Sequence, residues 1–254
     1  MNLLKNDIDI ILSRLVKQFS NENNSFESHS LESSKKKYSL IKFILGKGNK
    51  HKALISAGIH GDEPSGVETI CKFLENNQFE KFSKEWELTF LPCLNPYGYE
   101  YKSRENHEGK DLNRFFKDYN PPHEVIFAKS TLENPYDITI ELHEDFMSSG
   151  YYLYQLGSYP EDDQLGNKIL KGVKEVMPIN LNSEIDGHSA EAGIILHKTE
   201  FKSMDWWPMA YYSLYKGTRR CLTLETATKF SMDLRVEAHL IAINTALTFF
   251  SEKE

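Results

Sequence analysis

Short apolar runs alternate with helical segments along most of this chain, and this alternation constrains the fold more than any other feature. Runs of strand-like length are bounded by turn-forming residues: KALISAGI, WELTFLPCL, YDITIELH and RRCLTLET. Segments with helical spacing lie between and after them, at residues 64–74, 123–132, 162–176 and 232–249. Strands that alternate with helices favour an α/β architecture. We therefore predict an α/β/α sandwich with a mixed, twisted central sheet, folded as a single domain.

The N-terminal segment has a different character. Its apolar residues recur at helical spacing and predict an amphipathic helix: Leu4, Ile8, Ile11, Leu12, Leu15 and Phe19. Residues 20–37 are rich in Asn, Ser and Lys and predict an exposed linker. We expect residues 1–37 to pack, as a helix and polar linker, on a main domain of residues 38–254. That domain opens with two strand-like runs around a GKGN turn, which predict a β-hairpin.

Composition argues against several classes of function and location. The formal net charge of -7 argues weakly against a nucleic-acid partner, because such partners call for a basic face. No stretch approaches the roughly 18 apolar residues of a membrane span, so no membrane partner is expected. Asp7, Asp9 and Arg14 interrupt the apolar N-terminal run, so we expect no signal peptide and a cytoplasmic location, with unconventional secretion left open. The 3 cysteines include no CxxC pair, which argues against a disulfide framework.

Residues able to bind a metal or carry a proton follow three of the strand-like runs. The run ALISAGI is followed by His60, with Glu63 soon after it, and the run DITIEL is followed by His143. The run CLTL is followed by Glu225. Open α/β sheets build their sites at the carboxyl ends of their strands. We therefore expect these four side chains to meet at one edge of the sheet.

His60, Glu63 and His143 have the composition of a catalytic zinc site. Such a site takes three protein ligands and leaves one position for water, and two histidines with one carboxylate are a standard set. His60 and Glu63 are close enough in sequence for one turn to direct both at the same ion, and Gly61 between them lets the backbone bend tightly. The sequence thus predicts one zinc ion per chain.

Two further features indicate hydrolysis of a substrate that carries a carboxylate. A hydrolase needs a carboxylate that takes a proton from water and passes it to the leaving group, and Glu225 at the end of an apolar strand is placed for this. Residues 95–120 predict a long loop that carries Arg104, Asn113 and Arg114. Arginine holds carboxylates through a two-pronged fork, and a second arginine can stabilise an oxyanion.

The motifs HGDE, DLNRFF, ELH and TLET, in this order and spacing, resemble the zinc metallocarboxypeptidase family of the carboxypeptidase A and B type. The shortened stretch between Glu63 and His143 is more similar to a small bacterial branch, which includes murein peptide amidases and the rapid-encystment-phenotype carboxypeptidase. The resemblance implies a carboxypeptidase-like sandwich and makes residues 38–254 the catalytic domain. It also implies a protease that removes the C-terminal amino acid of a peptide.

The resemblance gives each matched residue a role, beginning with the three zinc ligands already inferred. Asp111, in the family's D-x-N-R motif, would orient His60 from behind. Asn113 and Arg114 would grip the terminal carboxylate of the substrate. Arg104 would stabilise the oxyanion, and Glu225 would act as the general base. The implied partner is a peptide or small amide with a free carboxylate, and a monomer is favoured.

Some positions stay open at this level. The family uses a mobile tyrosine, and no motif selects one from Tyr151, Tyr152, Tyr154, Tyr211, Tyr212 and Tyr215. The specificity pocket is expected ahead of the general base, where an acid would favour terminal Lys or Arg and apolar walls would favour aromatics, with the candidates Asp205, Trp206, Trp207 and Met209. A second HxxE pair, His188 and Glu191 with His197 nearby, follows a polar loop rather than a buried strand. We interpret it as loop structure or a contact at the rim of the site.

Three other functions are weighed against the carboxypeptidase. Aspartoacylases and succinylglutamate desuccinylases share the HxxE, DLNR and distant-His pattern, but they cleave an N-acyl group from an amino acid. They carry a further β-rich segment after the catalytic glutamate, whereas the residues after Glu225 have the pattern of one helix. A murein peptide amidase would act on a cell-wall peptide. A non-catalytic binding module is disfavoured by the complete set of ligands, base and arginines.

Overall fold

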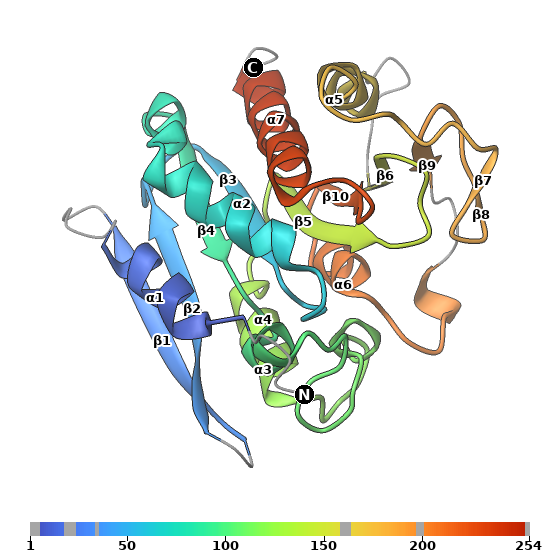
Figure 1. Ribbon diagram of the computed structural model, residues 1–254. Helices are drawn as coiled ribbons and strands as arrows, with labels where there is room; N and C mark the ends of the chain where they lie inside the picture. Colours follow the sequence, from blue (N-terminus) through green and yellow to red (C-terminus); the bar gives the residue numbers. More distant parts are fainter. Residues whose placement is uncertain (1–5, 18–23, 34–35, 158–163, 197–200, 252–254) are drawn as a thin grey trace.

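The structure is a computed structural model that describes residues 6–17, 24–33, 36–157, 164–196 and 201–251. Its centre is an 8-stranded mixed sheet in the order β1-β2-β4-β3-β5-β10-β6-β9 (Figure 1). The strands of this sheet are β1 (Ser25–Glu32), β2 (Lys37–Leu45), β3 (His51–Ala57), β4 (Trp86–Leu91), β5 (Ile138–Asp145), β6 (Tyr152–Gly157), β9 (Ile194–Leu196) and β10 (Arg220–Ala227). A separate ribbon pairs β7 (Glu184–Ile185) with β8 (His188–Ser189).

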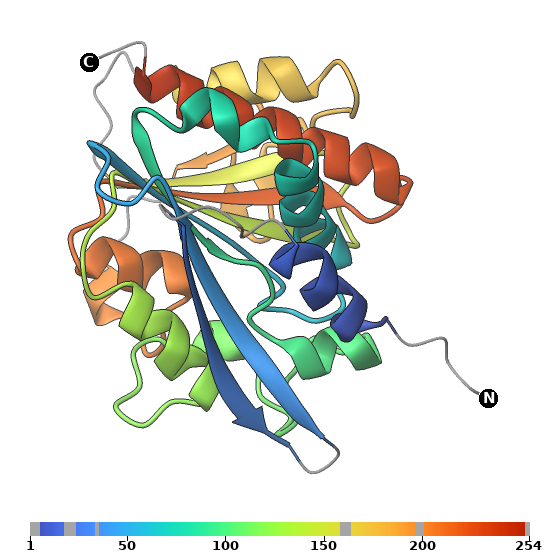
Figure 2. The same ribbon diagram turned by 90° about the vertical axis from the view of Figure 1, so that its left-hand side faces the viewer.

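Helices cover both faces of the sheet. They are α1 (Ile8–Val16), α2 (Pro64–Glu75), α3 (Pro96–Tyr101), α4 (His123–Thr131), α5 (Leu165–Val173), α6 (Met209–Tyr215) and α7 (Met232–Ser251). Figure 2 shows α2, α5 and α7 on one side of the sheet and α4 and α6 on the other. The predicted single-domain α/β/α sandwich with a mixed sheet is therefore confirmed. None of the helices in the described ranges is long and apolar enough to cross a membrane.

Four central strands run parallel, and this arrangement decides where a site can form. β4, β3, β5 and β10 lie side by side in parallel register. Nearly every side chain of β3 and β5 is buried, as expected for strands with helices on both faces. The carboxyl ends of β3, β5 and β10 therefore open at the same edge of the sheet, next to the start of α2.

The main core holds α2 close against the sheet. Phe43, Phe73, Phe90 and Trp86 are fully buried there, and the rings of Phe43 and Phe90 stack with their centroids 4.8 Å apart. Gly66 in the first turns of α2 lies so near β5 that a Cβ atom in its place would be 2.8 Å from Cβ of Leu142. The start of α2 is therefore fixed directly beside the end of β5.

The N-terminal segment confirms one prediction and corrects another. α1 forms and buries Ile8, Ile11 and Leu15, whereas Leu4 and Phe19 lie outside the described residues. The predicted linker is wrong for Ser25–Glu32, which is the edge strand β1. Only Leu31 is buried in this strand, so its sequence lacks the apolar alternation that marks a strand, and backbone pairing with β2 holds it. Residues 20–23 and 34–35 of the predicted linker lie outside the described part of the chain.

The predicted β-hairpin is also wrong, although both of its strands exist. Gly46 and Gly48 adopt positive φ and turn the chain between β2 and β3. β4 lies between these two strands, antiparallel to β2 and parallel to β3. The apolar side chains of β4 are buried at this position between two strands. If β2 and β3 had paired directly as a hairpin, β4 could not have occupied it.

Candidate active site

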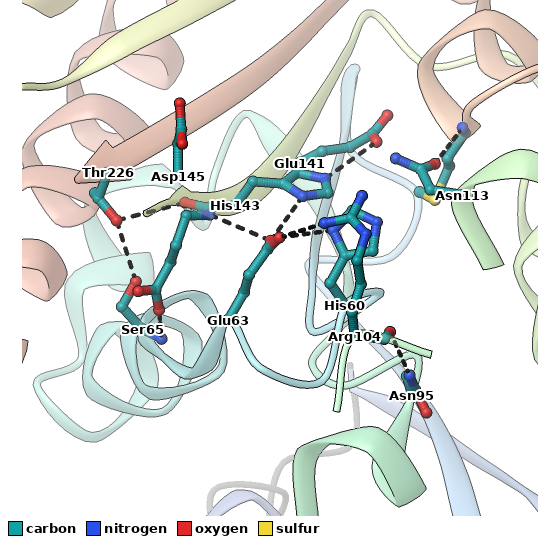
Figure 3. Close-up of polar contacts among 12 residues, drawn as sticks. His60, Glu63, Ser65, Asn95, Arg104, Asn113, Glu141, His143, Asp145 and Thr226 are labelled. Atoms are coloured by element: carbon teal, nitrogen blue, oxygen red, sulfur yellow. Dashed lines mark hydrogen bonds and ion pairs between the residues drawn. The ribbon is translucent and has the colours of Figure 1, made fainter. Parts of the chain in front are cut away.

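Three buried side chains at the edge of the parallel strands form a compact cluster. His60 lies on the turn that follows β3, Glu63 caps the start of α2, and His143 lies on β5. Oε1 of Glu63 is 2.7 Å from Nδ1 of His60, and its Oε2 is 2.9 Å from Nδ1 of His143 (Figure 3). One ligand atom from each residue lies within 4.8 Å of the other two. The sequence-predicted ligands are therefore brought together.

The local sequence explains how the turn between β3 and α2 is held. Gly58 adopts positive φ, and a Cβ atom at Gly61 would lie 1.9 Å from the carbonyl carbon of Gly98. Only a glycine lets this turn lie directly on α3. Pro64 then starts α2, where its lack of an N–H costs nothing. This turn fixes the positions from which the first two side chains of the cluster project.

The cluster has the chemistry of a divalent metal site. Both imidazoles present Nδ1 to the same carboxylate, which leaves each Nε2 free to face another group. Burial alone would raise the pKa of Glu63, but His143 and His60 outweigh it and hold that pKa below its usual value. An ionised carboxylate between two imidazoles, with all three side chains buried, is a donor set that fits a metal ion.

Asp111 lies behind the cluster and connects it to the long loop. Its Oδ1 is 3.2 Å from Nε2 of His60, and its Oδ2 accepts from Nε of Arg104 at 3.1 Å. Burial raises the pKa of Asp111, but His60 and Arg104 reverse this effect and leave the pKa below its usual value. Arg104 also donates from Nη1 to Glu63 at 3.4 Å. A ligating histidine usually donates its second N–H to such a carboxylate.

A cavity of about 350 Å³ opens beside the cluster, and both predicted substrate-binding residues line it. Asn113 and Arg114, on a short 3-10 turn at Leu112–Arg114, both line it. Oδ1 of Asn113 accepts from the backbone N–H of Met209 at 2.8 Å, which fixes the amide. The guanidinium of Arg114 lies over the ring of Trp206, 4.1 Å from its centroid. The cavity thus has a positively charged wall.

Glu225 lies on β10 and lines the same cavity. It is paired in parallel register with His143 on β5 and in antiparallel register with Tyr152 on β6. Burial raises the pKa of Glu225 well above its usual value, against the opposing effect of His143. A carboxylate in this environment is suited to accept and return a proton.

Comparison with known families identifies the chain at this point. The sequence matches the model of the succinylglutamate desuccinylase/aspartoacylase catalytic domain over residues 49–225. The chain belongs to this family. No curated protein matches the sequence significantly. The family places the chain in the wider group of zinc carboxypeptidase-like proteins, so the resemblance inferred from the motifs is confirmed.

Solved structures agree with this assignment at the level of fold. The fold is similar to a candidate metallopeptidase from Shewanella denitrificans (TM-score 0.79, 20% identity, 96% of this chain and 90% of the other). It is similar to a metallo-carboxypeptidase from Burkholderia cenocepacia (TM-score 0.72, 15% identity, 98% and 70%). It is also similar to a succinylglutamate desuccinylase/aspartoacylase from Rhodobacter sphaeroides (TM-score 0.62, 17% identity, 92% and 66%). The chain is a hydrolase of the metallopeptidase or deacylase type.

The structure also shows which of the candidate tyrosines and specificity residues line the cavity. Tyr154 and Tyr211 line the cavity. The hydroxyl of Tyr152 donates to Asp145, that of Tyr212 donates to Glu133, and Tyr151 is buried in the core. Among the four specificity candidates, Trp206 alone lines the cavity, whereas Trp207 and Met209 are buried and Asp205 is exposed.

The second HxxE pair does not form a metal site in the described residues. His188 lines the cavity from the β7–β8 ribbon, while Glu191 is exposed to solvent. His197 lies outside the described residues. Among the residues that the structure describes, His60, Glu63 and His143 form the one group able to hold a metal. The position of His188 fits the predicted contact at the rim.

Sequence reasoning missed two acids that line the cavity, Glu141 and Asp186. Glu141 precedes His143 by two residues on β5 and so projects from the same face of the strand. The period of a strand was therefore a signal that could have found it. Asp186 lies in the tight turn of the β7–β8 ribbon and accepts from the hydroxyl of Tyr154 at 2.6 Å. No motif marks Asp186, because the fold alone brings this ribbon to the cavity.

Proposed function

We propose that this chain is a zinc-dependent metallocarboxypeptidase that releases the C-terminal amino acid of a peptide. The observation that carries the proposal is one cavity that joins the His60–Glu63–His143 cluster to Glu225 and to Arg114. Arg114 and Asn113 would hold the terminal carboxylate of the peptide. The distance from this grip to the cluster would select the last peptide bond for cleavage.

A zinc ion bound by the three ligands would polarise the scissile carbonyl and make a bound water more acidic. Glu225 would take the proton of the attacking water and deliver it to the departing amine. Its raised pKa favours the second half of this task, because a carboxyl that retains a proton is a better acid catalyst near neutral pH. Arg104 would stabilise negative charge on the carbonyl oxygen while Asp111 holds its guanidinium in place.

N-acyl amino acid deacylation is the second candidate, and the family match favours it. The acidic substrates of that reaction, such as N-acetylaspartate and N-succinylglutamate, carry two or more carboxylates. The cavity is lined by Arg104 and Arg114, and Arg104 already contacts Asp111 and Glu63. One arginine is therefore left to bind one carboxylate. This charge count supports a peptide substrate over an acidic acyl amino acid.

A panel of substrates tests the proposal. Zinc-loaded protein is incubated with blocked dipeptides that end in Phe, Leu, Lys, Arg or diaminopimelate, and with N-acetylaspartate and N-succinylglutamate. The amino acid released is quantified with and without a chelator of divalent metals. We expect release of the terminal residue from at least one dipeptide, abolished by the chelator. Hydrolysis of the acyl amino acids alone, with zinc bound, would assign the chain to the deacylases instead.

A further inference from the structure

The register of three neighbouring strands places a second row of side chains next to the metal row. His143 on β5 is level with Glu225 on β10, and Glu141 is level with Thr223. Tyr154 on β6 is level with Thr223 from the other side. Residues two positions apart point to the same face of a strand and are separated by roughly 7 Å. Glu141, Thr223 and Tyr154 all line the cavity, so this second row is one step deeper than the metal row.

Glu141 is the unexplained member of the second row. Its side chain is buried, with 2% of the residue exposed, and Oε1 has no hydrogen-bond partner. Its Oε2 lies 3.9 Å from Nε2 of His143, which is longer than a hydrogen bond. A buried carboxylate oxygen without a donor is costly, and native structures seldom retain one without a reason. Figure 3 shows the carboxyl of Glu141 extending past His143 on the side of Asn113.

The arginines of the cavity do not compensate this carboxylate. Arg104 donates to Asp111 and Glu63, as described above. Arg114 lies over Trp206 and donates to the backbone oxygen of Asn113 at 3.3 Å. His143 faces Oε2 of Glu141, so Oε1 is the carboxylate oxygen without a donor among the described residues, and a cation in the cavity would supply one.

The remaining walls suit the rest of such a molecule. Leu156, Pro208, Ala210 and Tyr211 give the cavity that Glu141 lines an apolar part of its wall. An aliphatic stem can lie along apolar walls while its charged end meets a partner. Nearer the solvent, the exposed Asp186 adds a second negative charge and is held by Tyr154. Apolar walls with an acid at depth match an alkyl chain that ends in a cation.

We propose that Glu141 forms a cation-binding subsite that selects substrates whose terminal residue has an ammonium or guanidinium group on an aliphatic side chain. This inference rests on the proposed peptidase function. The carboxylate of the terminal residue is held by Arg114, and its side chain extends into the second row, where Oε1 of Glu141 accepts hydrogen bonds from the cation. An acidic terminal side chain is excluded because it meets Glu141.

A matched pair of substrates isolates the charge. Blocked dipeptides ending in Lys and in norleucine have side chains of similar length, and only one of them is charged. We expect kcat/KM of the zinc-loaded protein to be roughly 30-fold or more higher for the Lys substrate. Glu141→Gln should bring the ratio of kcat/KM for the Lys substrate over the norleucine substrate close to 1. Asp205→Asn, an exposed acid outside the cavity, is the matched control and should change neither value.

Three results would overturn the proposal. The first is equal or higher kcat/KM of the unmodified protein for norleucine. The second is that Glu141→Gln lowers kcat/KM equally for both substrates and weakens zinc binding, which would make Glu141 a support for His143. The third is that Glu141→Asp, which keeps the charge, loses the preference for Lys completely although it folds. The thermal unfolding of each variant is measured, and the first comparison needs no variant at all.

A binding measurement separates this inference from the proposed function. Calorimetric titration of the zinc-loaded protein with free L-lysine and with L-norleucine requires no turnover. Tighter binding of L-lysine that depends on Glu141 would sustain the subsite even if no dipeptide were hydrolysed, and the peptidase proposal alone would then fail. Equal binding of the two amino acids, together with an absence of hydrolysis, would overturn both.

Discussion

Glu225 on β10 is the parallel neighbour of His143 on β5, so a predicted proton carrier and a predicted metal ligand are adjacent across one pair of strands. This relationship needs no loop to maintain it, because the hydrogen bonds of two buried central strands fix the register. The two residues come from parts of the chain separated by α5, the β7–β8 ribbon and α6. Because Glu225 is the predicted proton carrier and His143 a predicted metal ligand, loss of catalysis and loss of metal binding can be tested separately.

Replacement of Glu225 with Gln should abolish turnover and leave the metal bound. The amide cannot accept the proton of water, so we expect kcat to fall by about 10²–10⁴-fold. Metal content measured by atomic emission should equal that of the unmodified protein. Glu191→Gln, at the exposed end of the second HxxE pair, is the control and should retain activity. Full activity of Glu225→Gln would show that another group carries the proton.

Replacement of Asp111 with Asn should weaken metal binding. Asp111 faces Nε2 of His60, and the loss of its negative charge removes the group that orients this imidazole. We expect the affinity for zinc, measured by competition with a chelator, to fall by about 10–100-fold. The exposed Asp118, changed to Asn, should leave the affinity as it is. An unchanged affinity in Asp111→Asn would mean that packing alone positions His60.

Replacement of Gly61 with Ala should destabilise the fold and disrupt the metal cluster together. The new Cβ atom would lie 1.9 Å from the carbonyl carbon of Gly98 and 2.2 Å from N of Tyr99, and backbone atoms cannot move aside cheaply. We expect a loss of about 3 kcal/mol in the free energy of unfolding, measured in urea. Gly109→Ala meets no atom within 4 Å, and its positive φ alone should cost about 1–2 kcal/mol. Equal losses in the two variants would contradict a role for the close approach.

The three cysteines should be unreactive until the protein unfolds. Burial raises the pKa of Cys71 and of Cys221 to about 12, and it also raises the pKa of Cys93 above its usual value. The thiolate is the reactive form, so at pH 8 a thiol with such a pKa stays protonated as well as inaccessible. A chromogenic disulfide reagent at pH 8 should therefore detect no thiol in the native protein and all three after denaturation in guanidinium. Rapid reaction of one native thiol would show that its segment opens.

The sequence could predict the central elements because their signals are local and repeated. The predicted strands that include Trp86, Ile138 and Arg220 are all strands of the sheet. The helix predicted at residues 64–74 is α2. The sequence could not predict β1, because a strand with a single buried side chain carries no apolar alternation. It also could not place β4 between β2 and β3, because the order of strands depends on how α2 crosses the sheet rather than on any local turn.

The sequence by itself determined the residue types of the site and the segments that carry them. His60, Glu63, His143 and Glu225 each follow an apolar run, and parallel strands bring their carboxyl ends to one edge. Only the tertiary structure decided which other side chains join them. It placed Glu141 in the cavity and left Asp205 in solvent, although Asp205 was the acid that the sequence offered for the specificity pocket. The physical reason is that the charge of each side chain and its spacing along the chain are properties of the sequence. The burial of a side chain, and the absence of a hydrogen-bond partner for it, arise only when distant strands pack together.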